Sequence, residues 1–426
     1  MKKVVLFLNQ INYENYDFSQ TPNRNQYYWV ACVGPIAQER YGNLLHQHMD
    51  KVISVQEATD MAHRVIDHSL DFEEIAEHTE DLIEQAGGPE NVIIVCADEL
   101  NINLAGHLRD HFNIPGDGFI ACDTYRNKAL MKQSVKASNV RTPKYTTFDK
   151  LQAETNPKAY FEHIQKSITC PFIIKPTAGG GSFSTYKIEN WEQFAHHLGD
   201  LIQNHFELEV EEFINGTMYH CDGIMNSTKI LHAFPSIYSC PNLEFTTGKN
   251  LMSLPLHPKE AIYQKIIAFT HETIKALGYV TGAFHFEFFD KEDSGELVFI
   301  EIAARPPGAL LSTNLNRQFG LNLFNADYCL KSGEFFEYFE RPIEQYSFSG
   351  FAPNQHGEVA ALNTPTVQGE IECNWLVKIG DHLHHPTSLP DRCVTFIVCN
   401  KDYEQLKTDM YKLESFPFIT MKDQKT

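Results

Sequence analysis

The feature that most constrains this chain is a pair of apolar segments, each of which carries one glutamate. Residues 284–289 and 297–302 alternate in the manner of β-strands and flank a polar turn at residues 290–296, which predicts a β-hairpin. If the turn is centred on Ser294, Glu287 and Glu301 lie opposite each other on one face. Their Cβ atoms would then be about 5 Å apart.

Two like charges in this position destabilise a sheet unless another group offsets them. A bound cation does so, and hard oxygen ligands suit Mg²⁺, so Glu287 and Glu301 are predicted to bind a metal ion. The alternative is a pair of exposed glutamates on a solvated face, which the strongly apolar neighbours disfavour. Arg305 follows in the segment Arg305-Pro306-Pro307-Gly308, at the end of the hairpin, where it could meet phosphate.

Length and composition indicate a globular protein. The chain has 426 residues, of which 42% are hydrophobic and 21% charged, enough for roughly two or three domains. No apolar run approaches the ~20 residues that span a bilayer, and the apolar stretch at residues 4–8 is too short for a signal-peptide core. The ten cysteines include no C-x-x-C pair. We therefore expect a cytoplasmic protein with reduced thiols and no membrane association.

The net charge of −20 argues against non-specific binding of nucleic acid. An acidic protein that binds an anionic nucleotide must concentrate its lysines and arginines at one site.

The first 120 residues alternate between the two kinds of secondary structure. Strands are predicted at residues 4–9, 28–33, 52–55 and 92–96, and a helix at 71–85 ends before Gly87-Gly88, a typical helix stop. This pattern indicates a small α/β domain. It lacks G-x-G-x-x-G after its first strand, so no dinucleotide site is predicted there.

The middle of the chain mixes helices with strands. Helices are predicted at residues 123–138 and 257–277, Asn215-Gly216 predicts a hairpin turn, and residues 239–256 resemble a loop. From about residue 340 the pattern changes to short strands, which indicates a separate, mostly β portion.

A glycine-rich loop follows the predicted strand at residues 172–176. Gly179, Gly180, Gly181 and Ser182 would let backbone N–H groups approach phosphate closely. Lys175, at the end of the strand, supplies a point charge. This is not a Walker A loop, because the lysine precedes the glycines. A flexible hairpin turn would explain the glycines but not a lysine in an apolar strand, since buried lysines are rarely unpaired.

Two further segments could belong to the same site. Lys128, at the start of a helix, could reach the same phosphates, although alone it would more often be an exposed residue. The strand at residues 209–214 has the sequence Glu-Val-Glu-Glu-Phe-Ile. An edge strand of this kind can pair with the Watson–Crick edge of adenine, and the alternative is a plain acidic strand.

Taken in order, these elements resemble the ATP-grasp superfamily, and in particular its carboxylate–amine ligases such as L-amino acid ligases and carnosine-synthase-like enzymes. The resemblance covers roughly residues 115–330. It implies an α/β protein of the α+β grasp type, with a Rossmann-like domain at residues 1–120 and a two-subdomain ATP-grasp domain at 121–340. The lid would span about 140–215, and residues 341–426 would complete the substrate-side domain.

The resemblance also implies roles for individual residues. Lys128 and Lys175 would bind the α- and β-phosphates, and the glycine loop would close over the triphosphate. Glu287 and Glu301 would hold Mg²⁺, which Mn²⁺ could replace. Arg305, with Lys175, would stabilise the phosphoryl group in transfer. The adenine-binding segment would use Glu211, Glu212, Phe213 and Ile214.

Two departures from the family pattern concern metal and nucleotide binding. Ala303 stands where relatives often have an asparagine ligand, so water or phosphate oxygens would complete the metal shell. Met218 follows Gly216-Thr217 where many relatives have a glutamate for the ribose. Either His220 or Asp222 would then replace it, or the ribose contact is lost.

The implied activity is an ADP-forming ligase that activates a small carboxylic acid, such as an amino acid, as an acyl phosphate and joins it to an amine. The alternatives are a silent nucleotide-binding protein, which Ala303 and Met218 favour, and an ATP-grasp kinase without a ligation step. Asn314 and Arg317 follow the metal strand and could bind a substrate carboxylate. The expected partners are small molecules, and family habit suggests a homodimer.

Overall fold

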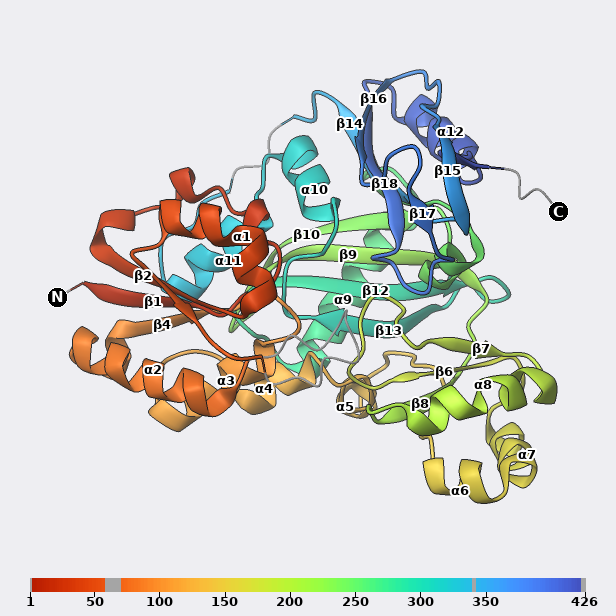
Figure 1. The fold of residues 1–426 in the computed structure, drawn as a ribbon, viewed down its shortest axis with the longest axis horizontal. Helices are drawn as coiled ribbons and strands as arrows, with labels where there is room; N and C mark the ends of the chain where they lie inside the picture. The colour runs from red at the N-terminus through yellow and green to blue at the C-terminus, as the bar shows by residue number, and fades with distance from the viewer. Residues whose placement is uncertain (1, 58–69, 339–341, 423–426) are drawn as a thin grey trace.

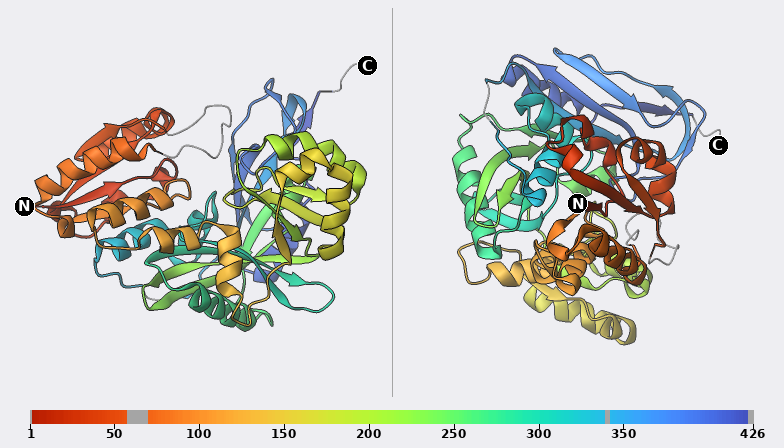
Figure 2. Two further views of the ribbon diagram at one scale, coloured as in Figure 1. Left: turned by 90° about the horizontal axis from the view of Figure 1, so that it is seen from below. Right: turned by 90° about the vertical axis from the view of Figure 1, so that its left-hand side faces the viewer.

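The computed structural model describes residues 2–57, 70–338 and 342–422, and the strands in these ranges form four sheets (Figure 1). Figure 2 shows the N-terminal sheet at one end of the molecule and a small helix-covered sheet at the other. No helix in these ranges is long and apolar enough to cross a membrane.

The N-terminal sheet is parallel, in the order β3-β2-β1-β4. Val4 and Leu6 of β1 pack with one layer of helices and Val5 and Phe7 with the other. Both faces are therefore buried, which is why these strands are continuous apolar runs in the sequence. The predicted α/β character is confirmed. The elements are β1 (Lys3–Phe7), β2 (Tyr27–Val33), β3 (Lys51–Ser54), β4 (Val92–Val95), α1 (Pro35–His48), α2 (Phe72–Ala86) and α3 (Ile102–Phe112).

A small antiparallel sheet in the order β5-β8-β6-β7 carries the glycine loop. Phe172, Ile174 and Val210 face the helices and are fully buried. Because side chains alternate along a strand, Lys175, Glu209 and Glu211 point to the opposite face. The elements are β5 (Tyr145–Thr147), β6 (Phe172–Pro176), β7 (Tyr186–Ile188), β8 (Leu208–Glu212), α6 (Lys150–Thr155), α7 (Pro157–Ser167) and α8 (Trp191–Gln203).

The largest sheet has eight antiparallel strands in the order β13-β12-β9-β10-β11-β14-β18-β16. Their bounds are β9 (Gly216–Asn226), β10 (Lys229–Tyr238), β11 (Leu251–Pro255), β12 (Gly282–Lys291), β13 (Leu297–Ala303), β14 (Tyr346–Pro353), β16 (Glu370–Trp375) and β18 (Arg392–Asn400). The remaining strands, β15 (Gly357–Leu362), β17 (His382–Leu383) and β19 (Ile419–Met421), form a sheet of their own.

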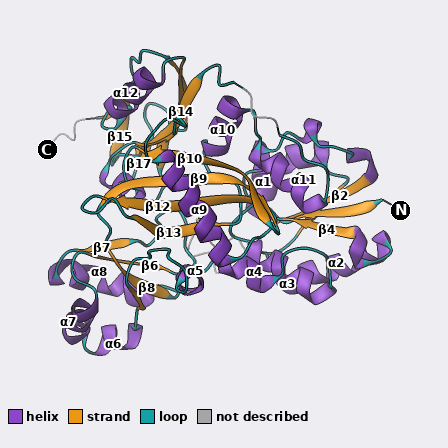
Figure 3. Cartoon of the chain, turned by 180° about the vertical axis from the view of Figure 1, so that it is seen from behind, coloured by secondary structure: helices purple, strands orange, loops and turns teal. Residues whose placement is uncertain are grey.

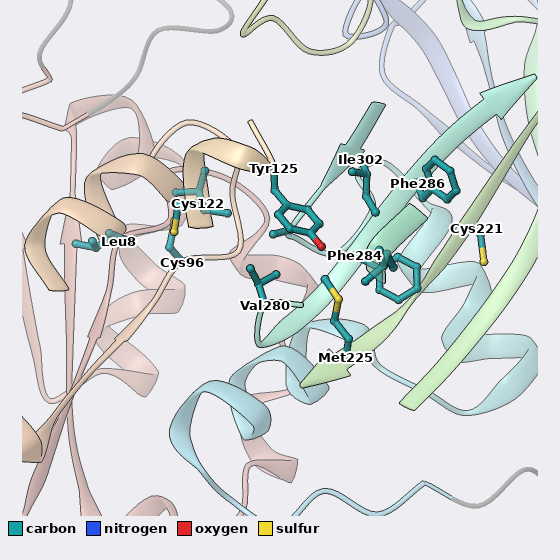
Figure 4. Close-up of a cluster of buried hydrophobic side chains, with 14 of the residues drawn as sticks. Leu8, Cys96, Cys122, Tyr125, Cys221, Met225, Val280, Phe284, Phe286 and Ile302 are labelled. Carbon is teal, nitrogen blue, oxygen red and sulfur yellow. The ribbon is translucent and has the colours of Figure 1, made fainter. Parts of the chain in front are cut away.

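One face of the large sheet is covered by α9 (Tyr263–Leu277), which crosses β9 and β12 in Figure 3. Phe286 and Phe288 are fully buried there, each with its ring centroid 5.5 Å from that of Phe269. Tyr125 joins the same cluster from the end of α4 (Phe119–Thr124), on the side of the N-terminal layers (Figure 4). The opposite face of β12 therefore carries His285 and Glu287.

The C-terminal strands β14, β16 and β18 extend the same sheet that contains the glutamate hairpin, and α12 (Tyr403–Leu413) packs on β14 and β18. The predicted boundary near residues 340 and 341 falls outside the described residues. The division into three domains therefore stays a prediction.

Three expectations about local structure are wrong. The helix expected at 123–138 is split, because Asn127 caps a new helix, α5 (Lys128–Val135), with its side chain. Asn215-Gly216 does not turn a hairpin, because β8 and β9 belong to different sheets. Gly216 instead allows two backbones to approach closely, since an added Cβ would lie 2.2 Å from the backbone oxygen of Asp290. The expected loop at 239–256 contains β11.

Candidate active site

The two glutamates of the hairpin face each other, as the sequence predicted. Glu287 of β12 is the direct partner of Glu301 of β13. The register of the two strands shifts by one residue beside this pair. Phe288 is opposite Phe299, so Ile300 is an extra residue that forms a β-bulge. Without this bulge, Glu301 would pair with Phe286 and point toward α9, because a one-residue slip exchanges the faces of a strand. The bulge thus places both carboxylates on the face toward the small sheet.

Glu287 is almost completely buried, at 4% exposure. Its Oε1 accepts hydrogen bonds from the Tyr238 hydroxyl at 2.8 Å and the Asn242 amide at 2.9 Å, and lies 3.3 Å from His285 Nε2. Burial alone would raise the pKa of Glu287, but its contact with His285 and these hydrogen bonds outweigh burial and lower the pKa to about 2. Glu287 is therefore ionised at neutral pH.

The donor set fits a divalent cation. All the contacts of Glu287 among the described residues fall on Oε1, which leaves Oε2 available, and Glu301 uses Oε2 for Lys128 Nζ at 2.8 Å. Two carboxylate oxygen donors from facing strands are what Mg²⁺ prefers, with water or phosphate oxygens in its remaining positions. Ala303 pairs with His285 and supplies no ligand.

The glycine loop lies between β6 and β7 and is joined to the start of α5. The Lys128 N–H donates to the Thr177 oxygen at 2.9 Å, and Lys128 Nζ donates to the Gly179 oxygen at 2.5 Å. Gly181 adopts φ 62°, a left-handed conformation that favours glycine. Its carbonyl accepts a hydrogen bond from the Leu389 N–H at 3.2 Å. The loop therefore contacts both α5 and the C-terminal part of the chain.

Each of the three cations predicted to meet phosphate has a carboxylate partner. Lys128 lies 2.8 Å from Glu301, Lys175 lies 2.5 Å from Glu211, and Arg305 Nη2 lies 2.5 Å from Glu99. Burial lowers the pKa of Lys175, but the charges of Glu211 and Glu209 outweigh burial and raise it above its ordinary value. A bound polyphosphate would have to replace these carboxylates as the partner of each cation.

Glu99 is a site residue that the sequence reasoning missed. It follows β4 and accepts hydrogen bonds from Arg126 at 2.9 Å and from Arg305 at 2.5 and 3.0 Å. Burial raises the pKa of Glu99, but the charges of Arg305, Arg126 and Lys128 outweigh burial and hold it well below its ordinary value. Its position past the carboxyl end of a parallel strand, where α/β folds bind ligands, is the signal that could have identified it.

The predicted adenine segment is not an edge strand. β8 pairs with β5 on one side and with β6 on the other, so most backbone groups of Glu209 to Glu212 are used in the sheet. The Glu212 N–H donates to the Lys144 oxygen at 2.8 Å. Only Phe213 and Ile214 lie beyond the ladder, and Ile214 is buried at 3% exposure.

The side chain predicted to contact ribose faces inward. His220 is 1% exposed, and its Nε2 lies 2.6 Å from the Ser253 hydroxyl while its Nδ1 lies 2.8 Å from Asp222. A ribose contact by His220 stays a prediction, and it would require these contacts to break.

Asp222 also lies 2.6 Å from His285 Nδ1. Its carboxylate therefore lies between the imidazoles of His220 and His285, a contact that the sequence did not predict. Burial lowers the pKa of His285, but Asp222 and Glu287 outweigh burial and raise it to about 10. The protonated ring can then donate toward Glu287. His220, Asp222 and His285 offer ligand atoms within 4.8 Å of one another, although the hydrogen bond to His285 already uses one oxygen of Asp222.

The two predicted substrate residues make contacts elsewhere. Arg317, on α10 (Leu311–Phe319), binds both oxygens of Glu372 at 2.8 and 2.7 Å. Asn314 is 2% exposed and donates to the Ser347 oxygen at 3.2 Å. Among the described residues, these contacts lead to β16 and β14 rather than to Arg305 or the two glutamates. Their role in substrate binding remains a prediction without support from this arrangement.

Sequence comparison finds relatives for the central part of the chain. Residues 135–315 match the family described as D-ala D-ala ligase C-terminus. An L-arginine-specific L-amino acid ligase of Bacillus subtilis is 27% identical over 239 residues, which are 55% of this chain and 56% of that protein. The chain thus spans about half the length of this curated relative.

Comparison of structures extends the likeness over nearly the whole chain. An L-amino acid ligase from Bacillus licheniformis superposes with a TM-score of 0.70, at 13% identity, over 99% of both chains. A carboxyaminoimidazole ribonucleotide synthase from Aspergillus clavatus, solved in complex with ATP, superposes with a TM-score of 0.66, at 12% identity, over 97% of both chains. At these identities the likeness establishes the fold.

Proposed function

Because the chain has the ATP-grasp fold and contains a domain related to the C-terminal domain of D-alanine–D-alanine ligases, we propose that it is an ATP-dependent, ADP-forming ligase. It would activate a small carboxylic acid, expected to be an amino acid, and join it to an amine. The observation that carries this proposal is the opposed pair Glu287 and Glu301, with Lys128 2.8 Å from Glu301 and Arg305 two residues beyond the end of β13.

In this proposal ATP lies between the small sheet and the polar face of the large sheet. Lys128 and Lys175 bind its α- and β-phosphates, and the glycine loop covers the triphosphate. The N–H of Ile214 faces adenine N1, because Phe213 and Ile214 lie beyond the last residue of β8. Glu211 already accepts from two lysines, so its contact with adenine N6 would add to those bonds.

Glu287 and Glu301 would hold Mg²⁺, or Mn²⁺ in its place. When bound, the ion neutralises negative charge on the phosphate oxygens. Glu287 is kept ionised and in place by Tyr238, Asn242 and His285.

In the first step, an oxygen of the substrate carboxylate attacks the γ-phosphorus of ATP. The new O–P bond forms an acyl phosphate, and the bond to the β-phosphate oxygen breaks to release ADP. Positively charged side chains stabilise the phosphoryl group during this transfer. Arg305 suits the task, because Nε and Nη2 of its guanidinium, which both donate to Oε2 of Glu99, can instead donate to phosphate oxygens.

In the second step, the amine attacks the acyl carbon, and phosphate leaves as the amide forms. The departing phosphate can accept the proton that the amine loses. The acyl phosphate must be protected from water, and the glycine loop, which contacts both α5 and Leu389, is placed to close over it.

We also propose a cytoplasmic location, which is supported by ten cysteines without a disulfide among the described residues. The partners would be the small-molecule acid and amine. A homodimer is proposed only from the resemblance to the family.

The test is a screen of the full chain with ATP, Mg²⁺ and each of the common amino acids, singly and in pairs. The proposal expects ADP and phosphate release that depends on a second amino acid or amine, and an amide product by mass spectrometry. A stable phosphorylated acid would indicate a kinase, and bound but uncleaved ATP would indicate a silent binding protein. Either result would overturn the ligase proposal.

A further inference from the structure

Lys132 is a buried cation for which the proposed reaction has no direct use. It lies on α5, one helical turn after Lys128, and its side chain is fully buried. Its Nζ lies 2.5 Å from Glu209 and 2.7 Å from Glu211, and 5.0 Å from the centroid of the Tyr145 ring. A lysine enclosed in this way cannot reach a ligand without leaving both carboxylates.

Lys132 and Lys175 share the same two carboxylates. Glu211 gives Oε2 to Lys132 and Oε1 to Lys175, at 2.7 and 2.5 Å. Glu209 presents Oε1 to both lysines, at 2.5 and 3.9 Å, and it is 1% exposed. The cluster thus pairs two lysines with two glutamates in a buried region.

This balance of charge matters when Lys175 binds a phosphate oxygen instead of Glu211. If Lys175 turns from Glu211 to a phosphate oxygen, the two carboxylates keep one cation. A buried carboxylate without a partner is strongly unfavourable. Without Lys132, Glu209 and Glu211 would therefore hold Lys175 in place, and their negative charges would repel the phosphates.

We infer that Lys132 is a positioning residue for the nucleotide site, an inference that rests on the proposed function. Its ammonium group is a fixed counter-charge that bridges Glu209 and Glu211, so that Lys175 can exchange Glu211 for the triphosphate of ATP. Lys132 itself touches no substrate. The specific consequence is that its removal weakens nucleotide binding through Lys175 and not through the acid or amine site.

The test compares Lys132→Met, which keeps the length of the side chain, with Lys136→Met, an exposed lysine one turn further along the same segment. Titration calorimetry with Mg-ADP and Mg-ATP should show a dissociation constant raised about tenfold or more in Lys132→Met, since breaking a buried ion pair exceeds that factor. It should be unchanged in Lys136→Met. The KM for ATP should rise while the KM for the amino acid stays within about twofold.

A second variant keeps the inference testable if Lys132→Met does not fold. Glu209→Gln removes the carboxylate that competes for Lys175, so it should bind Mg-ADP at least as tightly as the unmodified chain. The double variant Lys132→Met/Glu209→Gln should bind more tightly than Lys132→Met alone, which a merely structural role would not produce.

Unaltered nucleotide binding in folded Lys132→Met, or clearly weaker binding in Glu209→Gln, would overturn the inference. If the unmodified chain itself fails to bind Mg-ADP and Mg-ATP, the proposed function fails, and the inference fails with it. These outcomes are distinguished by whether the unmodified chain binds nucleotide.

Discussion

The substitution Glu301→Gln separates the role of this side chain in the reaction from its role in folding. Among the residues that the structure describes, Glu301 makes one ion pair, with Lys128, and its side chain is 28% exposed. Exposed pairs stabilise proteins by about 1 kcal/mol or less. The Lys128 side chain is only 5% exposed, but it keeps the Gly179 carbonyl as an acceptor, and glutamine has nearly the same shape and retains one oxygen. We therefore expect the free energy of unfolding to fall by no more than about 1 kcal/mol, and the melting temperature by only a few degrees, roughly 2–4 °C.

The effect on turnover should be far larger. Glu301→Gln removes one of the two negative charges that face each other across the hairpin and releases Lys128 from its partner. Loss of a single preorganised electrostatic group costs about 10²–10³ in rate, or roughly 3–4 kcal/mol. Since Glu301 would also be a metal ligand, turnover should fall by ~10³ or more, so the change in activation free energy should exceed the change in stability several-fold.

The assay is ADP release coupled to product mass, together with thermal unfolding and a titration with Mg²⁺. Glu370→Gln is the matched control, because Glu370 is an exposed glutamate on the edge strand β16. Full activity in Glu301→Gln would refute the assignment of the metal site. A loss of stability large enough to account for the lost activity would refute the separation of the two roles.

Four further outcomes are expected. Lys175→Ala should abolish turnover while the protein stays folded, because Lys132 still holds Glu211, and circular dichroism with an activity assay will check this. Glu99→Gln should slow turnover by about tenfold or more, because Glu99 holds Arg126 and Arg305 in position before phosphate binds. Since the pKa of Glu99 lies below its ordinary 4.5, the free energy of unfolding should decrease as pH falls below 4.5, and denaturant titrations should show a smaller decrease in Glu99→Gln. Chelation of divalent ions should stop ADP release, and Mg²⁺ or Mn²⁺ should restore it, so activity that persists in excess chelator would contradict a metal-dependent reaction.

The glutamate hairpin could be predicted because its information is local. The two strands are separated by a short polar turn, and a period of two residues places both glutamates on one face. The sequence did not predict the bulge at Ile300, because a bulge depends on how the rest of the sheet packs. The pairing of Glu287 with Glu301 was correct, but Phe288 is opposite Phe299 and not Ile300.

The wrong local predictions have a common physical cause. Asn215-Gly216 is a strong turn signal on its own, yet β8 and β9 enter different sheets, and glycine serves there to let two backbones approach. β8 was predicted to be an edge, but whether a strand is at an edge depends on the strand that lies beside it. That strand, β5, is a short segment far from β8 in the sequence.

The sequence by itself determined the kind of protein and the chemical groups of its site. Strand and helix periodicity, the three glycines and the lysines and glutamates near them all act over a few residues, so their signals survive without the fold. Tertiary structure alone decided which charges meet. Glu99 reaches Arg305 from 206 residues away, Lys132 joins Glu209 from 77 residues away, and Arg317 turns to Glu372. Such pairs depend on how whole sheets pack together, because a buried charge takes whichever partner the fold brings within reach.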